Sequence, residues 1–267
     1  MSKRIAARKS RAKESKRNAP HRGKVTVVGI GPGSTDHLTN IAVAEIRSAD
    51  CIVGFSPYVE QVRRVIRPGT VVYSSSMGHE VDRALHALKL AAKGSRVALV
   101  SGGDPGVYGM AGPVLETARR LGTNVEVNIV PGVTAATASA ASLGSPLMND
   151  FAVISLSDLL TPRKKILERV KSAVKGDFVL VLYNPQSRER KKPLRLVHRL
   201  LRKYRKLTTP VGIVSAYSRK GEKLVVTTLE RMLDHEIDMT STIIVGNSST
   251  VAINHKMLTP RGYFRSK

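Results

Sequence analysis

A single carboxylate, Asp104, lies inside a glycine-rich turn, Gly-Gly-Asp-Pro-Gly, at residues 102–106. The turn follows an apolar run at 97–100 and precedes a segment with helical spacing at 110–121. Turns of this kind at strand ends are where α/β proteins bind ligands, because glycine lets the backbone approach a ligand closely. Asp104 adds one fixed hydrogen-bond acceptor. The pattern predicts a small-molecule site at the carboxyl edge of a sheet.

Three other apolar runs end in comparable turns. They are Gly-Ile-Gly-Pro-Gly at 29–33, Pro-Gly-Val-Thr-Ala at 131–135 and Tyr-Asn-Pro at 183–185. The carboxyl ends of parallel strands gather along one edge of a sheet and form a cleft there. One such turn alone is usually structural. Four together, with Asp104 as the acid among them, favour a ligand site.

The turn at 29–33 does not match a dinucleotide-binding loop. Its spacing is GxGxG, whereas the fingerprint is GxGxxG, and Pro32 removes one backbone N–H donor. A pyrophosphate depends on those donors, so we exclude a nicotinamide site. The chain also lacks a GxxxxGK phosphate loop and a GxSxG nucleophile elbow, which argues against phosphate-loop and α/β-hydrolase chemistry.

Metal and disulfide chemistry are not expected. The seven histidines are scattered, and no pair combines helical ligand spacing with a third partner. The lone cysteine, Cys51, lies in an apolar run and is interpreted as a small buried hydrophobe. The sequence therefore predicts no metal held by the protein.

The alternation of apolar and amphipathic segments predicts an α/β fold. Up to residue 142, strands alternate with helices, as a parallel sheet requires, and later strands follow one another directly, as in a mixed sheet. A Gly/Pro/Asn cluster at 144–150 marks a domain boundary. We expect a disordered basic arm at 1–23, a parallel-sheet domain at 24–146 and a mixed-sheet domain at 147–267.

The expected strands are 24–28, 51–54, 71–73, 97–100, 125–130, 151–155, 178–183, 211–214, 223–227 and 242–245. The expected helices are 39–49, 80–92, 110–121, 134–142, 162–174 and 193–204.

The formal net charge of +24 is extreme, and the first 24 residues alone carry +9. A basic arm could bind RNA, but it lacks aromatic stacking residues, so we interpret it as a solubilising tail with loose affinity for polyanions. A second basic block at 188–206 is interpreted as a solvated helix face, or as a receptor for a ligand with several carboxylates. Without a signal peptide or a long apolar run, we expect a cytoplasmic protein that does not enter a membrane.

Three motifs in this order, Gly-Ile-Gly-Pro-Gly, Gly-Gly-Asp-Pro and Pro-Gly-Val-Thr-Ala, resemble the tetrapyrrole methylase family, and the resemblance covers residues 24 to about 263. It implies two α/β domains with the active site between them, S-adenosylmethionine as cofactor and a homodimer. Within the family the chain is most similar to members that methylate ring carbon 17 of precorrin-3B or cobalt-precorrin-3, with ring contraction, in cobalamin biosynthesis. The stretches that carry this finer similarity are 77–84, 150–162, 182–187, 245–249 and 259–263.

The resemblance also implies positions for the site. The cofactor is expected to contact four segments of the chain. They contribute Gly102, Gly103, Asp104 and Val107, then Thr134 and Ala135, then Tyr183 or Asn184, and finally Thr227 or Thr228. The loop Gly31, Pro32 and Gly33 is expected to face the macrocycle. No Cys-bearing extra domain is present in the sequence, so no iron–sulfur cluster is expected.

The implied reaction is an in-line transfer of a methyl group from a sulfonium to a ring carbon. Orientation of two reactants can supply about 7–11 kcal/mol of a barrier, so no protein nucleophile is needed. Ring contraction requires proton transfer, for which we name Asp36 and His79, although a capping or surface role is as good an explanation for each. A strongly basic protein attracts a polycarboxylate macrocycle.

Two other interpretations stay open at this point. A sister methylase could act on another ring carbon, on diphthine or on ribosomal RNA. A protein that binds RNA on a methylase scaffold would explain the basic arm, but it would not explain the intact glycine turns. The sequence leaves open whether the substrate contains cobalt.

Overall fold

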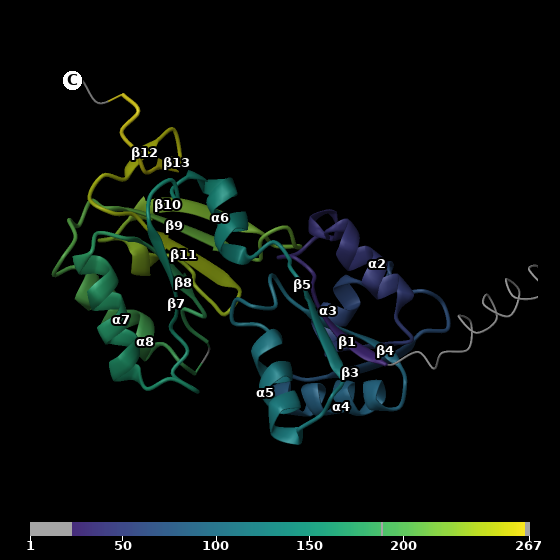
Figure 1. Ribbon diagram of the computed structural model, residues 1–267. Helices are drawn as coiled ribbons and strands as arrows, with labels where there is room; N and C mark the ends of the chain where they lie inside the picture. The colour runs from purple at the N-terminus through teal and green to yellow at the C-terminus, as the bar shows by residue number, and fades with distance from the viewer. Residues whose placement is uncertain (1–22, 188, 265–267) are drawn as a thin grey trace, which may run out of the picture. The chain divides into compact units, whose positions relative to one another are not determined.

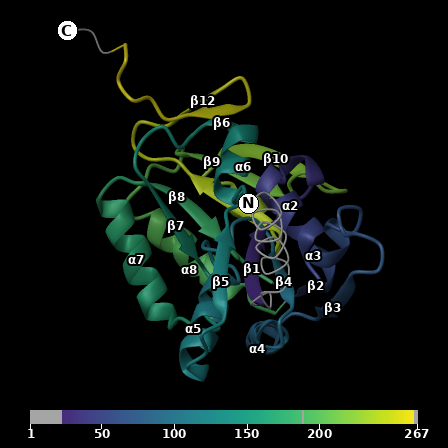
Figure 2. The same ribbon diagram turned by 45° about the vertical axis from the view of Figure 1, so that its right-hand side comes forward.

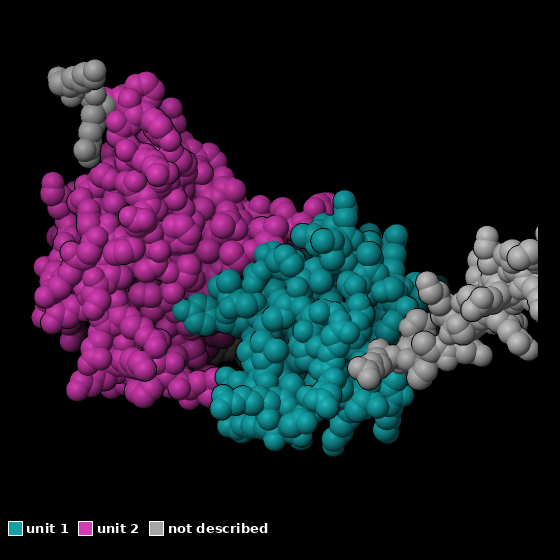
Figure 3. All heavy atoms as spheres, viewed as in Figure 1, with its two compact units in different colours: residues 1–30, 38–132 teal, residues 31–37, 133–267 magenta. Residues whose placement is uncertain are grey.

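The computed structural model describes residues 23–187 and 189–264, so the predicted basic arm lies outside the described residues apart from Gly23. The described chain forms two compact units (Figure 3). The first contains the residues up to Ile30 together with Leu38–Gly132, and the second contains Gly31–His37 and the residues from Val133 onward. The chain thus crosses between the units around the segment Gly31–His37 and again after Gly132, which lies upstream of the turn cluster at 144–150.

The first unit is built on a sheet of five parallel strands (Figure 1). In spatial order the strands are β3 (Val71–Ser75), β2 (Cys51–Phe55), β4 (Arg96–Ser101), β1 (Lys24–Gly29) and β5 (Glu126–Val130). The strands β4, β1 and β5, which precede three of the predicted turns, are therefore neighbours, and their carboxyl ends lie at one edge of the sheet. The predicted parallel sheet is confirmed.

Alternation along the strands explains why both faces of this sheet are covered. Val25 and Val27 of β1 pack with α4 (Glu80–Ala92) and α5 (Ala111–Leu121). Val28 points to the other face, where α2 (Asn40–Ser48) and α3 (Ser56–Gln61) lie. A side-chain cap starts α2, since Thr39 Oγ1 accepts from the Ala42 N–H at 3.1 Å.

The second unit is built on a mixed sheet, as predicted. Its strands, in spatial order, are β10 (Lys223–Thr228), β9 (Pro210–Ser215), β11 (Ser241–Val245), β8 (Val179–Tyr183) and β7 (Phe151–Ser155). Only β7 and β8, which lie side by side in Figure 2, pair in parallel, and the other three pairings are antiparallel. The direction of each strand decides which edge of the sheet its last residue reaches.

Helices cover both faces of this sheet as well. On one face α7 (Arg163–Lys175) and α8 (Lys192–Leu201) bury Leu180 and Leu182 of β8. On the opposite face α6 (Ala135–Leu143) packs on Val179 and Val181. The segment at 202–204, expected to be helical, is a turn, since the Lys203 and Tyr204 N–H groups donate to carbonyls three residues earlier.

Several short elements were not predicted. A small sheet joins β12 (Val251–Ile253), β13 (Lys256–Leu258) and β6 (Gly144–Ser145). The 3-10 turns η1 (Thr35–His37) and η2 (Met232–Asp234) and the six-residue helix α3 complete the set. Segments of this length are too short to show a periodic pattern.

Candidate active site

Three glycines pack against one another at the carboxyl edge of the first sheet. A Cβ added to Gly132 would lie 2.2 Å from the Gly103 carbonyl oxygen and 2.9 Å from the Gly29 Cα. A Cβ added to Gly29 would lie 2.6 Å from the Gly132 nitrogen. The turns after β1, β4 and β5 therefore touch through their backbones, and side chains at these three positions would separate them.

Asp104 ties two of these turns together. Its Oδ1 accepts from the Gly106 N–H at 2.8 Å, within its own turn, and its Oδ2 accepts from the Gly132 N–H at 3.1 Å, across 28 residues of chain. The carboxylate is only partly buried. Each oxygen keeps a further lone pair, so the carboxylate can accept an additional hydrogen bond from a ligand.

The remaining predicted residues of this turn lie close by. The Val107 N–H donates to the Asp104 carbonyl at 3.2 Å, and Gly103 has a φ of +63°. The Tyr58 ring of α3 lies against Gly102, where an added Cβ would meet its Cζ at 2.4 Å. Tyr58 was not predicted as a site residue, because it belongs to the short helix α3, which shows no periodic pattern in the sequence.

The Gly31–Gly33 loop is part of the second unit and is buried there. A Cβ at Gly33 would lie 2.3 Å from the Tyr217 carbonyl oxygen. The Arg219 Nε–H donates to the Pro32 carbonyl at 2.8 Å. The loop thus packs against the segment that follows β9, and its role toward a macrocycle stays a prediction.

The structure brings together Thr134, Ala135 and Tyr183. Thr134 is the N-cap of α6, but its own side chain does not cap the helix. Instead the Tyr183 hydroxyl at the end of β8 accepts from the Ala136 N–H at 2.5 Å and lies 2.6 Å from the Thr134 hydroxyl. The tyrosine therefore satisfies one of the N–H groups that a helix start leaves without an intrahelical partner.

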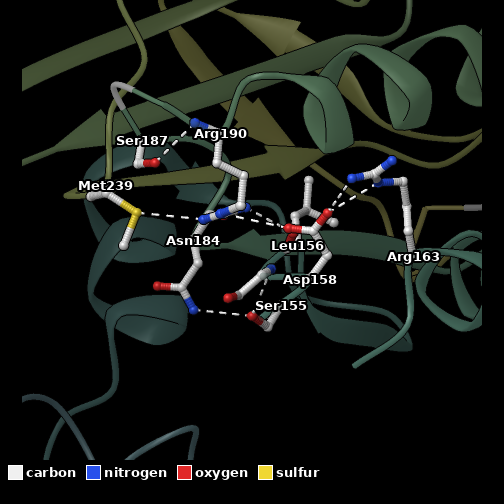
Figure 4. A network of polar contacts seen from close by, with 9 residues as sticks. Ser155, Leu156, Asp158, Arg163, Asn184, Ser187, Arg190 and Met239 are labelled. Carbon is white, nitrogen blue, oxygen red and sulfur yellow. Dashed lines mark hydrogen bonds and ion pairs between the residues drawn. The ribbon is translucent and has the colours of Figure 1, made fainter. Parts of the chain in front are cut away.

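Asn184 follows Tyr183 and adopts a φ of +51°. Its Nδ2 donates to Ser155 Oγ at 3.0 Å, which links the carboxyl ends of β8 and β7 (Figure 4). Arg190 donates to the Asn184 carbonyl at 3.0 Å and to the Leu156 carbonyl at 2.9 Å. These contacts join the Tyr-Asn-Pro turn to the loop after β7.

Asp158 continues this network. Arg163 donates to its Oδ2 through Nη2 at 2.6 Å and through Nε at 3.0 Å, and Arg190 Nε lies 3.9 Å from its Oδ1. The hydrogen bond from Arg163, opposed by desolvation, holds the pKa of Asp158 below its usual value. Asp158 is thereby kept ionised. Its two oxygens face two different arginines.

The structure does not bring Thr227 and Thr228 to this edge. The strands β8 and β9 both run antiparallel to β11, and β10 runs antiparallel to β9, so the end of β10 lies at the opposite edge of the sheet from Tyr183. Thr227 Oγ1 lies 3.0 Å from His235 Nε2. Their assignment to the cofactor stays a prediction.

The two predicted proton-transfer residues are both exposed. Asp36 Oδ2 accepts from the Ser34 hydroxyl at 2.8 Å, and His79 Nδ1 lies 2.8 Å from Asp82 Oδ2 at the start of α4. They belong to different compact units. Among residues 23–187 and 189–264, no three His, Cys, Asp or Glu side chains gather as metal ligands, and no helix is long and apolar enough to cross a bilayer.

The family model of the Tetrapyrrole (Corrin/Porphyrin) Methylases matches residues 24–233. The chain belongs to the tetrapyrrole methylase family. The predicted family is therefore confirmed, and with it the prediction that the protein is a methyltransferase.

Several curated relatives are similar to most of this chain. It is 44% identical over 239 residues to a probable cobalt-factor III C(17)-methyltransferase of Salmonella typhimurium, covering 90% of this chain and 99% of that protein. A precorrin-3B C(17)-methyltransferase of Sinorhizobium sp is 37% identical over 90% of this chain and 97% of its own length. A cobalt-factor III methyltransferase of Priestia megaterium is 44% identical over 91% of this chain, which spans only 46% of that relative.

Solved structures support the fold. The methyltransferase CobJ is 36% identical, covers 89% of this chain and all of its own, and has a TM-score of 0.83. A uroporphyrin-III C-methyltransferase from Thermus thermophilus, complexed with S-adenosylhomocysteine, is 25% identical, with a TM-score of 0.63 over 84% of this chain and 92% of its own.

Proposed function

We propose that this tetrapyrrole methyltransferase transfers a methyl group from S-adenosylmethionine to carbon 17 of a precorrin, either precorrin-3B or its cobalt-containing counterpart, with ring contraction, in cobalamin biosynthesis. The observation that carries the proposal is the 44% identity over 99% of a relative named for this reaction. The structural match to CobJ supports it, because that match covers 89% of this chain and is not confined to one of its two compact units.

The residues of the first unit fit the cofactor. The glycine cluster at Gly29, Gly103 and Gly132 leaves no side chain over the turn, and Gly102, Gly103 and Asp104 are only partly buried. Backbone polar groups and a carboxylate are thus available to an adenosine ribose or an amino-acid end. We assign Gly102, Gly103, Asp104 and Val107 to the cofactor. When bound, S-adenosylmethionine supplies an electrophilic methyl group on sulfur.

In the second unit, Thr134, Ala135, Tyr183 and Asn184 are assigned to the same cofactor. The Tyr183 hydroxyl, held at the start of α6, fixes the position of Thr134 and of the β8 end. The task of these residues is to orient and to exclude water, because the methyl donor carries the difficult chemistry. Asp36 and His79 remain the proposed proton-transfer residues, with Asp82 orienting the His79 ring.

A net charge of +24 favours attraction of a polycarboxylate tetrapyrrole and loose contact of the basic N-terminal segment with polyanions. We propose a homodimer in the cytoplasm. Sedimentation of the purified protein tests the dimer.

Calorimetric titration with S-adenosylhomocysteine tests the cofactor site. We expect micromolar binding by the wild type and at least tenfold weaker binding by Asp104→Asn, because the amide cannot accept both backbone hydrogen bonds. Glu116→Gln, on an exposed side chain of α5, is the matched control and should bind like the wild type.

Incubation with S-adenosylmethionine and either precorrin-3B or cobalt-factor III tests the reaction. We expect the enzyme to act on one of these two macrocycles and to add one methyl group to it. A folded wild type that binds neither S-adenosylhomocysteine nor a macrocycle would contradict the proposed function.

A further inference from the structure

Two leucines stand out on the surface of the second unit. Leu159 and Leu160 are 81% and 98% exposed, more than any other described leucine. Both belong to the loop between β7 and α7. An exposed leucine on its own needs no explanation, but an adjacent pair exposed to this degree is informative when the backbone that carries it is held firmly.

This loop is held at several points by hydrogen bonds. The Leu156 N–H donates to the Tyr183 carbonyl at 2.8 Å, and the Leu156 carbonyl accepts from Arg190 at 2.9 Å. Asp158, next to the leucines, receives two hydrogen bonds from Arg163. The loop that carries the pair is therefore anchored by the contacts of Leu156 with Arg190 and of Asp158 with Arg163, which Figure 4 shows.

The position of the loop connects it to the proposed cofactor residues. Ser155 pairs with Tyr183 in the parallel β7–β8 ladder, so both strands end at the same edge. Arg190 contacts the carbonyls of Leu156 and Asn184 together. One side chain thus fixes the loop that carries the leucines relative to the turn that carries Tyr183 and Asn184.

The charges around the leucines match one kind of occupant. The start of α7 places Arg163, Lys164 and Lys165 in succession just beyond the loop, and the described residues offer Lys164 and Lys165 no ion-pair partner. An apolar pair beside cations is complementary to a ligand that is apolar on its face and carries carboxylates at its rim. A tetrapyrrole with acetate and propionate groups has this character.

We propose that Leu159 and Leu160 form an apolar contact for the tetrapyrrole ring of the substrate, with Arg190 as the residue that positions their loop. The inference rests on the proposed function and deepens it, because it assigns a part of the macrocycle site to residues that the cofactor does not need. Lys164 and Lys165 are the matching carboxylate partners.

The test compares Leu159→Ser/Leu160→Ser with the wild type. Because both side chains are exposed, the variant should fold with an unchanged melting temperature. The relevant substrate is whichever of precorrin-3B and cobalt-factor III the wild type methylates. We expect the KM for that substrate to rise about tenfold or more, as for lost apolar contacts in a binding site. The Kd for S-adenosylhomocysteine should stay within about twofold. Leu121→Ser/Leu233→Ser is the matched control, since both leucines are exposed elsewhere.

Arg190→Lys provides the test of positioning. Lysine keeps the positive charge but cannot donate to two carbonyls in the fork geometry of arginine. We expect a raised KM for the macrocycle with little change in the Kd for S-adenosylhomocysteine. A purely structural role would lower the melting temperature and leave that KM unchanged.

The outcomes separate the inference from the proposed function. If the wild type methylates the macrocycle and the leucine variant keeps its KM within twofold, the inference is overturned and the proposed function stands. The same holds if the variant keeps its KM but loses self-association, because the pair would then be a contact between protein molecules. A wild type that binds S-adenosylhomocysteine but neither macrocycle would overturn both.

Discussion

The two units hold together the sheet edges that carry the predicted site turns in different ways. In the first unit the edge consists of backbone packed on backbone, with Gly29, Gly103 and Gly132 in mutual contact and Asp104 as the single side-chain clamp. In the second unit the edge is joined by side chains, through Tyr183 and Arg190 above all. An added side-chain atom in the backbone cluster would force the turns apart. By contrast, the unit can lose one side chain of the second network and still fold.

The sharpest way to test this contrast is Gly132→Ala. The new methyl group would lie 2.2 Å from the Gly103 carbonyl oxygen, and rigid backbone surrounds it. We expect the free energy of unfolding to fall by about 3 kcal/mol, as for overpacked sites, together with loss of S-adenosylhomocysteine binding. Denaturant unfolding measures the first effect and calorimetry the second.

The control for that variant is Gly112→Ala in α5, where an added Cβ meets nothing within 4 Å. This change should raise the free energy of unfolding by about 0.5–1 kcal/mol, because alanine loses less conformational freedom than glycine in a helix. Equal effects of the two substitutions would show that the glycine cluster has no special packing.

Arg190→Ala is the corresponding change in the second unit. It leaves the Leu156 and Asn184 carbonyls without this donor, so we expect unfolding to become easier by about 2 kcal/mol. Exchange of the backbone amides in the 156–162 loop should accelerate. Arg169→Ala, at an exposed arginine that makes no ion pair within the described chain, should change neither quantity.

Tyr183→Phe removes only a hydroxyl and should have a smaller effect. The Ala136 N–H and the Thr134 hydroxyl lose their common partner, which costs about 1 kcal/mol. Thermal unfolding measures the change. Tyr204→Phe, at an exposed ring, is the control, and an equal loss there would contradict the capping role of Tyr183.

The smallest expected effect concerns acid. The pKa of Asp158 is lower in the folded protein than in the unfolded chain, so its ion pair contributes stability above the unfolded pKa of about 4, and that contribution is lost as the pH falls through the folded value. We would measure the free energy of unfolding of the wild type and of Asp158→Asn between pH 6 and pH 3. As the pH falls, the free energy of unfolding should decrease less steeply for Asp158→Asn than for the wild type. An equal pH dependence for the two proteins would show that the ion pair of Asp158 does not contribute to stability.

The contrast between the two edges also decides what could be predicted. The glycine motifs mark the first edge directly, because a backbone that must pack closely requires glycine at particular positions. Apolar periodicity predicted the core strands and the larger helices to within a few residues, and α4 at Glu80–Ala92 coincides with its expected range. The six-residue helix α3, and Tyr58 with it, had no such signal.

Arg190 shows why the second edge was harder to predict. It belongs to a basic block that is most simply interpreted as a solvated face, yet its side chain is 13% exposed and reaches a carbonyl 34 residues away. A local pattern cannot show a contact over that separation. The sequence shows only that the basic block closely follows Tyr-Asn-Pro, and the fold shows that Arg190 donates to the Asn184 carbonyl.

By itself the sequence determined the α/β class, the parallel and mixed sheets and the glycine turns, because these follow from local periodicity and from backbone geometry that admits few residue types. The family was predicted from the resemblance of the three glycine motifs in their order along the chain. The tertiary structure decided the direction of each strand in the mixed sheet. That direction puts the end of β10, with Thr227 and Thr228, at the edge opposite Tyr183. It also decided that Asp104 clamps a turn 28 residues away. Both depend on pairing between distant segments, which residue patterns along the chain do not record.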